Sequence, residues 1–181
     1  MTCIVAIAKD GVVYMGADSY GSNRYTGGIV HNSKCFITGE FLIGSCGSFR
    51  LIDLLTHKLS VPKVHPDEQV NSDKFIRTIF VDAVRNCLNS NGHLTKKDGN
   101  DIGGNFLVGY KGNVYEVQQD FSVLNVPVWG HSVGSGEQAA HGSLFTTKDL
   151  DMTTEQRIEV ALEAAVAVVP SVRGPFVTLK L

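Results

Sequence analysis

Thr2, directly after Met1, is the residue whose place in the chain most suggests chemistry. A threonine hydroxyl is a weak nucleophile unless a base removes its proton, and loss of Met1 would leave Thr2 with its own α-amine as that base. Cys3 would take the same place if trimming went one residue further. Threonine also often follows a methionine without any chemical role, so a catalytic Thr2 needs partners elsewhere in the chain.

Two charged residues occur where the fold can return them to Thr2. Asp10 and Gly11 predict a hairpin between strands at residues 3–8 and 12–17, and this hairpin brings Asp18 back beside the start of the chain. Lys34 begins an apolar strand. An ammonium there would favour the Thr2 alkoxide and lower the pKa of the α-amine from its usual value of about 7.7–8.0. Without chemistry, Asp18 would start a turn and Lys34 would protect a strand edge.

Two glycine-rich turns connect a predicted strand to a predicted helix. In residues 44–48 the backbone N–H of Gly47 could serve as an oxyanion hole. In residues 134–136 the hydroxyl of Ser135 could cap the following helix or reach the network around Thr2. Each turn also has a simpler reading as a tight connection.

Taken in order, these segments resemble the β-type subunits of the proteasome and their smaller bacterial relative that partners a ring ATPase. The matching stretches are residues 2–5, 16–19, Lys34, 44–48 and 133–136. The resemblance implies that Thr2 is the nucleophile and that Asp18 and Lys34 orient and activate it. It further implies that Gly47 donates to the oxyanion and that Ser135 lies near the N-terminal amine.

The same resemblance indicates where substrate would bind. Ser22 falls in the segment whose backbone pairs with bound peptide in the family, and four further residues are expected near a small, weakly polar specificity pocket: Tyr20, Asn32, Ser45 and Cys46. One departure is clear. Residues 169–176 contain no aspartate, which many β subunits carry there, and the smaller bacterial relative also lacks that arrangement. Support for Thr2 must therefore come from other residues.

The pattern of elements predicts an α+β fold. Strands are expected at 3–8, 12–17, 28–30, 35–38, 41–44, 105–110, 113–118, 129–133 and 175–181, with helices from 48 to about 59 and at 72–91, 137–145 and 154–169. Residues 96–101 are expected in a loop. The first strand is apolar on both faces, which predicts cover on both sides. Two antiparallel sheets between helix layers fit this order, and the resemblance implies the four-layer αββα sandwich of N-terminal nucleophile (Ntn) hydrolases.

The last helix carries two predictions of its own. Thr153 or Thr154 should cap its N-terminus, with Gln156 as the partner in a capping box. After Ala161 the helix is apolar nearly all round, which predicts that it is buried on every side.

Bulk properties narrow the class of protein. With 181 residues, 43% hydrophobic residues and a net charge of −2, the chain is expected to form one domain, residues 1–181, that binds no nucleic acid. Neither a signal peptide nor a membrane-spanning stretch is recognisable, so a cytoplasmic protein is expected. The four cysteines form no CxxC pair, and neither a metal, a cofactor nor a disulfide framework is predicted.

The leading functional hypothesis is a threonine endopeptidase that becomes active when Met1 is removed. It would cleave peptides or unfolded proteins inside a self-compartmentalising homo-oligomeric ring, with a ring ATPase unfoldase as a possible partner. Two alternatives stay open: an Ntn amidohydrolase or acyltransferase acting on a small amide, and a catalytically silent ring subunit.

Overall fold

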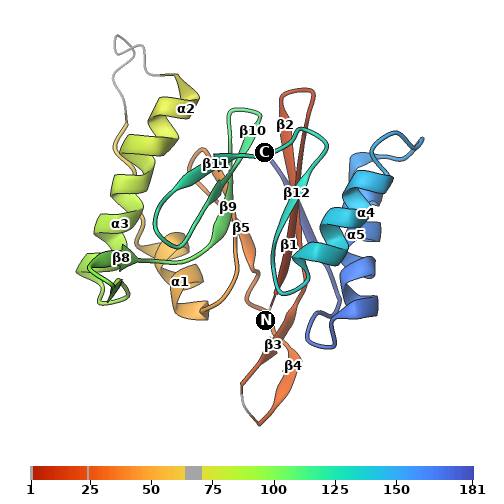
Figure 1. Ribbon diagram of the computed structural model, residues 1–181, viewed down its shortest axis with the longest axis horizontal. Helices are drawn as coiled ribbons and strands as arrows, with labels where there is room; N and C mark the ends of the chain where they lie inside the picture. The colour runs from red at the N-terminus through yellow and green to blue at the C-terminus, as the bar shows by residue number, and fades with distance from the viewer. Residues whose placement is uncertain (1, 24, 64–70) are drawn as a thin grey trace.

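The computed structural model describes residues 2–23, 25–63 and 71–181. Strands and helices follow one another in the predicted order (Figure 1). The strands are β1 (Cys3–Lys9), β2 (Val12–Ala17), β3 (Tyr20–Ser22), β4 (Gly27–Ile29), β5 (Cys35–Thr38), β6 (Phe41–Ser45), β7 (Thr95–Lys97), β8 (Asn100–Ile102), β9 (Phe106–Tyr110), β10 (Asn113–Val117), β11 (Val123–Asn125), β12 (His131–Gly134) and β13 (Val177–Lys180). The helices are α1 (Phe49–His57), α2 (Ser72–Phe75), the π-helical turn η1 (Ile76–Phe80), α3 (Val81–Ser90), α4 (Glu137–Thr146) and α5 (Thr154–Val168).

Two antiparallel sheets face each other across a shared apolar core. One has the strand order β12-β1-β2-β13 and the other β11-β10-β9-β6-β5. Ile4 and Met15 from the first sheet pack against Leu42 and Leu107 from the second, and all four are fully buried. At Gly44 a Cβ atom would lie 2.5 Å from the Ile4 side chain, so the sheets approach closely there.

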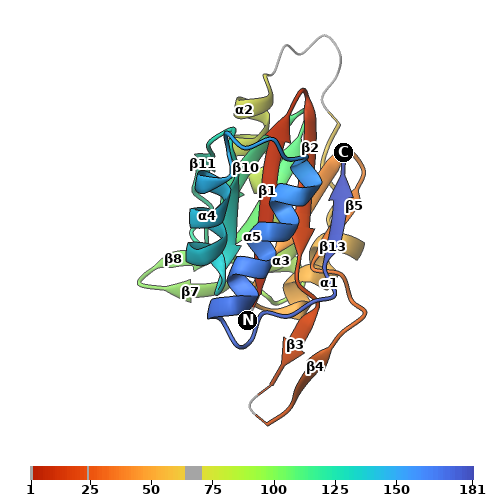
Figure 2. The same cartoon turned by 90° about the vertical axis from the view of Figure 1, so that its right-hand side faces the viewer.

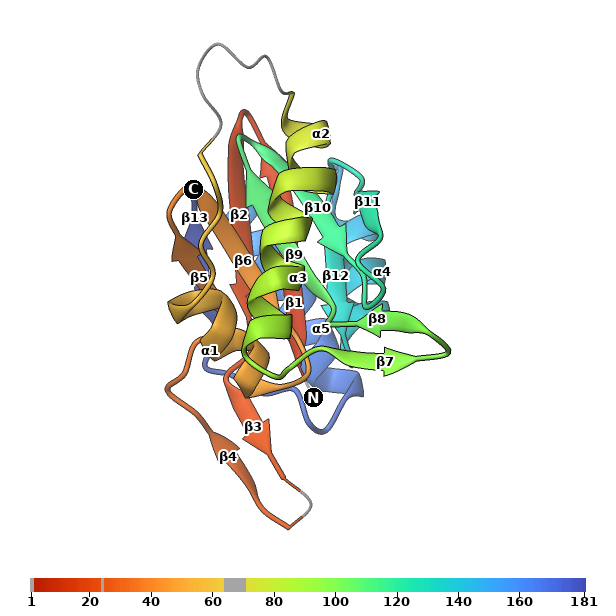
Figure 3. The same ribbon diagram turned by 90° about the vertical axis from the view of Figure 1, so that its left-hand side faces the viewer.

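Helices cover the outer face of each sheet. Helices α4 and α5 lie against β1, β2 and β12 (Figure 2), where Val5 and Ile7 pack against Ile158 and Leu162. Helices α1 and α3 lie against the other sheet (Figure 3). Strand β1 therefore buries Val5 against helices and Ile4 against the opposite sheet. The prediction that this strand is covered on both faces is confirmed.

The structure corrects the sequence predictions in two places along the middle of the chain. Residues 96–101, predicted as a loop, contribute to the β7–β8 hairpin. Apart from Ile102 this hairpin is built of polar residues and glycine, so it shows no hydrophobic alternation, and an ion pair between Arg85 and Asp101 connects it to α3. The short strand β11, which was not predicted, pairs with β10 at the sheet edge. The helix predicted at 72–91 is present, with a wider π-helical turn inside it.

Helix α5 has the predicted capping box between Thr153 and Gln156. The prediction that its C-terminal half is buried all round is wrong, because α5 lies in the outermost layer. Only one stripe, including Ile158 and Leu162, meets the sheet, while Val168 is 70% exposed. The apolar composition of α5 predicted its buried stripe, but it did not show that the opposite face has no neighbour among residues 2–23, 25–63 and 71–181.

Beyond the layers, the β3–β4 hairpin projects from the end of the molecule at which the N-terminus lies (Figure 1). This hairpin starts directly after Asp18 and Ser19, so its base touches the region of Thr2. None of the helices in the described part of the chain has the length and hydropathy needed to cross a bilayer.

Candidate active site

The β1–β2 hairpin places Asp18 beside Thr2, as the sequence predicted. Its register pairs Ile4 with Ala17, and the Asp18 N–H continues the ladder by donating to the Cys3 carbonyl at 3.3 Å. The Asp18 carboxylate points toward the start of β1, where its Oδ1 accepts the Cys3 N–H at 2.9 Å. Asp18 is thus bound to the residue that immediately follows Thr2.

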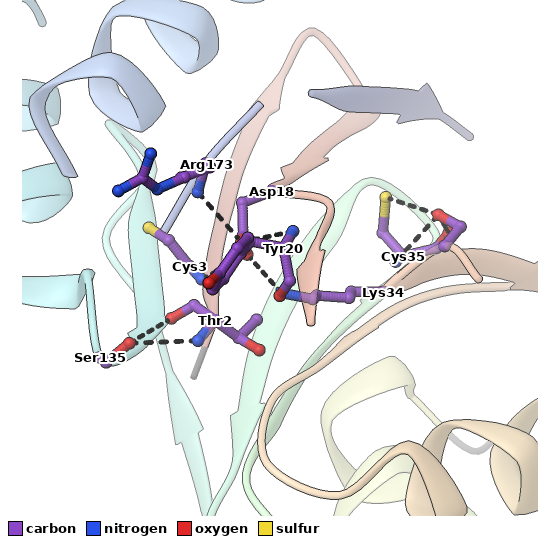
Figure 4. A network of polar contacts seen from close by, with 9 residues as sticks. Thr2, Cys3, Asp18, Tyr20, Lys34, Cys35, Ser135 and Arg173 are labelled. Atoms are coloured by element: carbon purple, nitrogen blue, oxygen red, sulfur yellow. Dashed lines mark hydrogen bonds and ion pairs between the residues drawn. The ribbon is translucent and has the colours of Figure 1, made fainter. Parts of the chain in front are cut away.

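Lys34 completes a buried ion pair with Asp18. Its Nζ donates to Asp18 Oδ1 at 2.8 Å and to the Tyr20 carbonyl at 2.7 Å, and its side chain is 1% exposed (Figure 4). Burial lowers the pKa of Lys34 below its ordinary value, and the hydrogen bond and charge of Asp18 oppose that shift. Lys34 is therefore a buried cation paired with a carboxylate, and not the solvated edge residue of the alternative reading.

Ser135 holds the backbone of Thr2 from the other side. Strand β12 pairs with β1 so that Gly134 lies opposite Cys3, which brings the next residue, Ser135, beside Thr2. The Thr2 N–H donates to Ser135 Oγ at 3.1 Å, and the same hydroxyl donates to the Thr2 carbonyl at 3.2 Å. Figure 4 shows Thr2 between Ser135 and the Asp18–Lys34 pair. Helix α4 is capped by Gly136 without a side-chain bond, so Ser135 serves the Thr2 network and not the helix.

The turn at Gly134 requires glycine for two separate reasons. Its φ of +102° lies in the region that other residues rarely adopt. A Cβ atom built on Gly134 would also stand 2.3 Å from the Thr2 carbonyl oxygen and 3.4 Å from Cβ of Cys46. Close approach of the two backbones is what lets Ser135 reach Thr2.

Gly47 lies in the turn between β6 and α1, with a φ of +96°. The turn is joined to the strand carrying Lys34, because the Ser45 N–H donates to the Lys34 carbonyl at 2.9 Å. Ser48 caps α1 by accepting the Arg50 N–H. Gly47 is exposed, and within the described residues no bond from its N–H to a backbone carbonyl is found outside the helices and strands.

The five residues expected to bind substrate differ in burial and in what surrounds them. Ser22 lines a cavity of about 400 Å³ between the β3–β4 hairpin and α1. Tyr20 belongs to the site through its backbone, while Asn32 is exposed in the following loop. Ser45 is fully buried with no hydrogen-bond partner for Oγ among the described residues, and Cys46 is half-buried with Sγ 3.2 Å from the Asn105 carbonyl; both lie at the end of β6.

Sequence reasoning missed three contributors to this site. The Tyr20 N–H donates to Asp18 Oδ2 at 3.1 Å, and the Arg173 N–H donates to the same oxygen at 3.5 Å. The third is the Cys3 N–H. Backbone groups leave no signal in residue types, although the stretch containing Arg173 had been singled out because it lacks an aspartate.

Cys3 is a weak rival to Thr2 as nucleophile in this structure. Burial, followed by the nearby Asp18 carboxylate, raises the pKa of the Cys3 thiol to about 12, and the side chain is completely buried. A thiol must ionise to attack, so Cys3 is unreactive here. Across residues 2–23, 25–63 and 71–181, no group of three His, Cys, Asp or Glu side chains is placed to hold a metal ion.

The hydrogen bonds place a buried carboxylate–ammonium pair next to the residue that follows Thr2, and a serine hydroxyl on the Thr2 nitrogen and carbonyl. A buried ammonium of this kind can stabilise a nearby alkoxide, and a hydroxyl on the nitrogen can orient it if that nitrogen becomes a free amine. Gly47 lies in an exposed turn, and a backbone N–H group in such a turn can bind developing negative charge.

Comparison with solved structures shows a shared fold. The chain is similar to Thiobacillus denitrificans BPH, with a TM-score of 0.81, 19% identity and coverage of 99% of this chain and 97% of that one. That protein is also known in complex with epoxomicin, at 18% identity, a TM-score of 0.81 and coverage of 99% and 98%. Eukaryotic HslV from Trypanosoma brucei has a TM-score of 0.71 at 16% identity, and covers 99% of each chain. No protein-family model and no curated protein matches the sequence.

Proposed function

We propose that this chain is a threonine-type peptidase whose nucleophile is Thr2, active once Met1 has been removed. The observation that carries the proposal is the buried Asp18–Lys34 pair, whose shared oxygen Oδ1 also binds the N–H of the residue following Thr2. A buried ion pair is costly to maintain unless it is well bonded, and this one lies beside the residue whose hydroxyl would be N-terminal after removal of Met1. The finer reading of the fold, the four-layer Ntn-hydrolase sandwich, belongs to the same proposal.

The proposed reaction begins with the Thr2 hydroxyl attacking a peptide carbonyl. Its proton passes to the α-amine of Thr2, which Ser135 Oγ orients, while the Lys34 ammonium stabilises the alkoxide as it forms. The carbonyl oxygen becomes an oxyanion that accepts the Gly47 N–H. The amine then returns the proton to the leaving group, the C–N bond breaks, and an ester to Thr2 Oγ1 remains. Water hydrolyses that ester, which restores the free hydroxyl.

Covalent capture tests this proposal directly. The protein is produced behind a cleavable fusion so that Thr2 becomes the first residue, then incubated with epoxomicin and examined by intact mass and peptide mapping. We expect one adduct per chain, located on Thr2, and none with Thr2→Ala or with protein that retains Met1. An adduct on Cys3, or no adduct on the Thr2-terminated protein, would refute the assignment.

The same protein separates the competing functions. Hydrolysis of fluorogenic peptides supports the peptidase, whereas turnover of small amides without peptide cleavage supports the amidohydrolase or acyltransferase. A protein that neither turns over substrate nor reacts with epoxomicin after release of Thr2 fits the silent subunit.

Assembly into a homo-oligomer is part of the proposal. Exposed apolar side chains on and between α4 and α5 support it: Phe145, Leu150, Val160, Val166 and Val168. Among proteins of similar fold, the Anbu complex from Pseudomonas aeruginosa forms a helical assembly, with a TM-score of 0.65 at 14% identity. Sedimentation velocity tests the point, since a monomer at all concentrations would contradict it. Peptides or unfolded proteins as substrates, and a ring ATPase as partner, rest on the sequence resemblance.

A further inference from the structure

Tyr20 is the residue that connects the two halves of the Asp18–Lys34 pair. Its N–H donates to Asp18 Oδ2, and its carbonyl accepts Lys34 Nζ at 2.7 Å, the shortest of the hydrogen bonds described for that ammonium. Displacement of the Tyr20 backbone would therefore remove one acceptor from Lys34 and one donor from Asp18. The position of the ammonium beside Thr2 depends on where Tyr20 is held.

Tyr20 begins a hairpin that lies outside both main sheets. Strand β3 pairs only with β4 among the described strands, and the hairpin projects beyond both main sheets (Figure 3). The Tyr20 side chain lies along this hairpin, because a Cβ atom on Gly27 would stand 2.0 Å from its hydroxyl. A contact from outside the hairpin would hold the ring, and with it the carbonyl on Lys34, more firmly in place.

Arg173 supplies that contact from the C-terminal segment. Its guanidinium carbon lies 5.8 Å from the centroid of the Tyr20 ring, within the range of a cation–π interaction. The guanidinium is itself anchored, since Nε donates to the Pro170 carbonyl at 3.1 Å. The backbone of the same residue donates to Asp18 Oδ2 and accepts the Ser19 N–H at 3.0 Å (Figure 4).

We propose that Arg173 is a positioning residue for the reaction at Thr2: its side chain holds the Tyr20 ring, and thereby keeps the Tyr20 carbonyl on the Lys34 ammonium. This inference rests on the proposed peptidase function for its catalytic consequence, though the contact itself does not. It also indicates how residues 169–176, which contain no aspartate, can support the site around Thr2. Where the aspartate of many β subunits is missing, this stretch supports the site through an arginine side chain and its backbone.

The variant Arg173→Ala removes the side chain and leaves the backbone bonds to Asp18 and Ser19 in place. We expect kcat for a fluorogenic peptide to fall about fivefold with little change in KM, since the arginine orients a catalytic group and does not touch substrate. Arg173→Lys keeps a cation over the ring and should recover most of the loss. Arg85→Ala is the matched control, an exposed arginine in an ion pair on distant α3, and should leave kcat unchanged.

A second readout works whether or not the protein is a peptidase. With lysine labelled at 13Cε, the Lys34 resonance, assigned by its absence in Lys34→Met, is titrated by NMR. The groups that face Lys34 include the Asp18 carboxylate and the thiols of Cys3 and Cys46, which the Arg173 and Tyr20 variants leave in place. Arg173→Ala also removes a positive charge beyond Tyr20, which by itself favours the charged form of Lys34, whereas loss of the Tyr20 acceptor disfavours it. Tyr20→Leu removes the same contact and keeps the Arg173 charge, so Lys34 should titrate at lower pH in Tyr20→Leu than in the wild type.

The outcomes are distinct. Wild-type Lys34 titration in Tyr20→Leu would overturn the inference, whatever the activity. Wild-type protein without turnover or epoxomicin adduct would refute the peptidase proposal, while a lowered Lys34 titration in Tyr20→Leu would still establish the contact. If Tyr20→Leu does not fold, Arg173→Ala takes its place and is compared with Arg173→Lys, which keeps the charge, and Lys34 must titrate at lower pH in Arg173→Ala than in Arg173→Lys. Where Arg173→Ala and Tyr20→Leu both fold, the double variant should lower kcat no further than either single variant, because the two substitutions break the same contact.

Discussion

Replacing Lys34 tests both the stability and the chemistry of the buried ion pair. Lys34→Met keeps much of the side-chain volume and removes the charge, so the Asp18 carboxylate, which is 0% exposed, loses its cation. Breaking a buried pair by removing one partner costs about 3–5 kcal/mol. Asp18 retains three backbone donors, from Cys3, Tyr20 and Arg173, so we expect a loss near the lower end, about 3 kcal/mol.

The catalytic effect should be larger than the stability effect suggests. The Lys34 ammonium is the only cation within hydrogen-bonding distance of Asp18 among the described side chains, and in the proposed reaction its charge favours the Thr2 alkoxide. Removing a preorganised group of this kind lowers kcat by about 10²–10³-fold. The double variant Lys34→Met/Asp18→Asn no longer buries an unpaired charge, so it should regain stability while turnover stays low.

Urea unfolding followed by circular dichroism measures the first effect, and peptide hydrolysis with the rate of epoxomicin capture measures the second. Turnover by Lys34→Met within about fivefold of the wild type would refute the role of Lys34 in the chemistry. Equal stability of Lys34→Met and wild type would refute the energetic argument, and a double variant as unstable as the single one would show that charge burial is not the cause.

Two further perturbations follow from the structure. Gly134→Ala places a Cβ atom 2.3 Å from the Thr2 carbonyl oxygen at a φ of +102°, so it should lower the free energy of unfolding by about 2 kcal/mol or more and abolish capture at Thr2. The control Gly142→Ala lies in open space on α4 and should raise the free energy of unfolding by about 0.5–1 kcal/mol. Similar urea midpoints for the two variants would contradict this prediction. Burial raises the pKa of Cys3 to about 12 and that of Cys35 to about 11, above the value of about 8.5 expected for an unfolded thiol. The contribution of the two protonated thiols to stability is therefore complete below about pH 8.5 and is lost as the pH rises toward their folded-state pKa values. Between about pH 8.5 and 10.5 the double variant Cys3→Ala/Cys35→Ala should lose stability less steeply than the wild type. Parallel plots of unfolding free energy against pH would disprove this prediction.

Much of the local structure was predictable because its determinants are local. The apolar pattern of residues 3–8, with the Asp10 and Gly11 turn, is sufficient for the β1–β2 hairpin and hence for the return of Asp18 to Thr2. The capping box is likewise determined by four consecutive residues, from Thr153 to Gln156. The α+β class and the two antiparallel sheets follow from the order of such elements.

The β7–β8 hairpin and the exposed face of α5 could not be predicted in the same way. Residues 95–101 are polar or glycine and only Ile102 is apolar, so no hydrophobic pattern marks the two strands, and the ion pair of Asp101 with Arg85 on α3 involves residues distant in the sequence. For α5, composition shows that the surface is apolar, but whether it is covered depends on what packs against it. Val168 is exposed because, in the part of the chain that the structure describes, no element lies beyond α5.

The sequence by itself determined which residue types are available to act at the N-terminus: a threonine, an aspartate one hairpin away, a lysine opening a strand and a serine in a glycine turn. These choices follow from periodicity and turn chemistry, which act over a few residues. Only the tertiary structure decided how they are bonded, because the bonds run through backbone groups that every residue possesses. The Cys3 N–H, the Tyr20 carbonyl and the Arg173 N–H meet around Asp18 and Lys34 only when segments more than 150 residues apart are packed together.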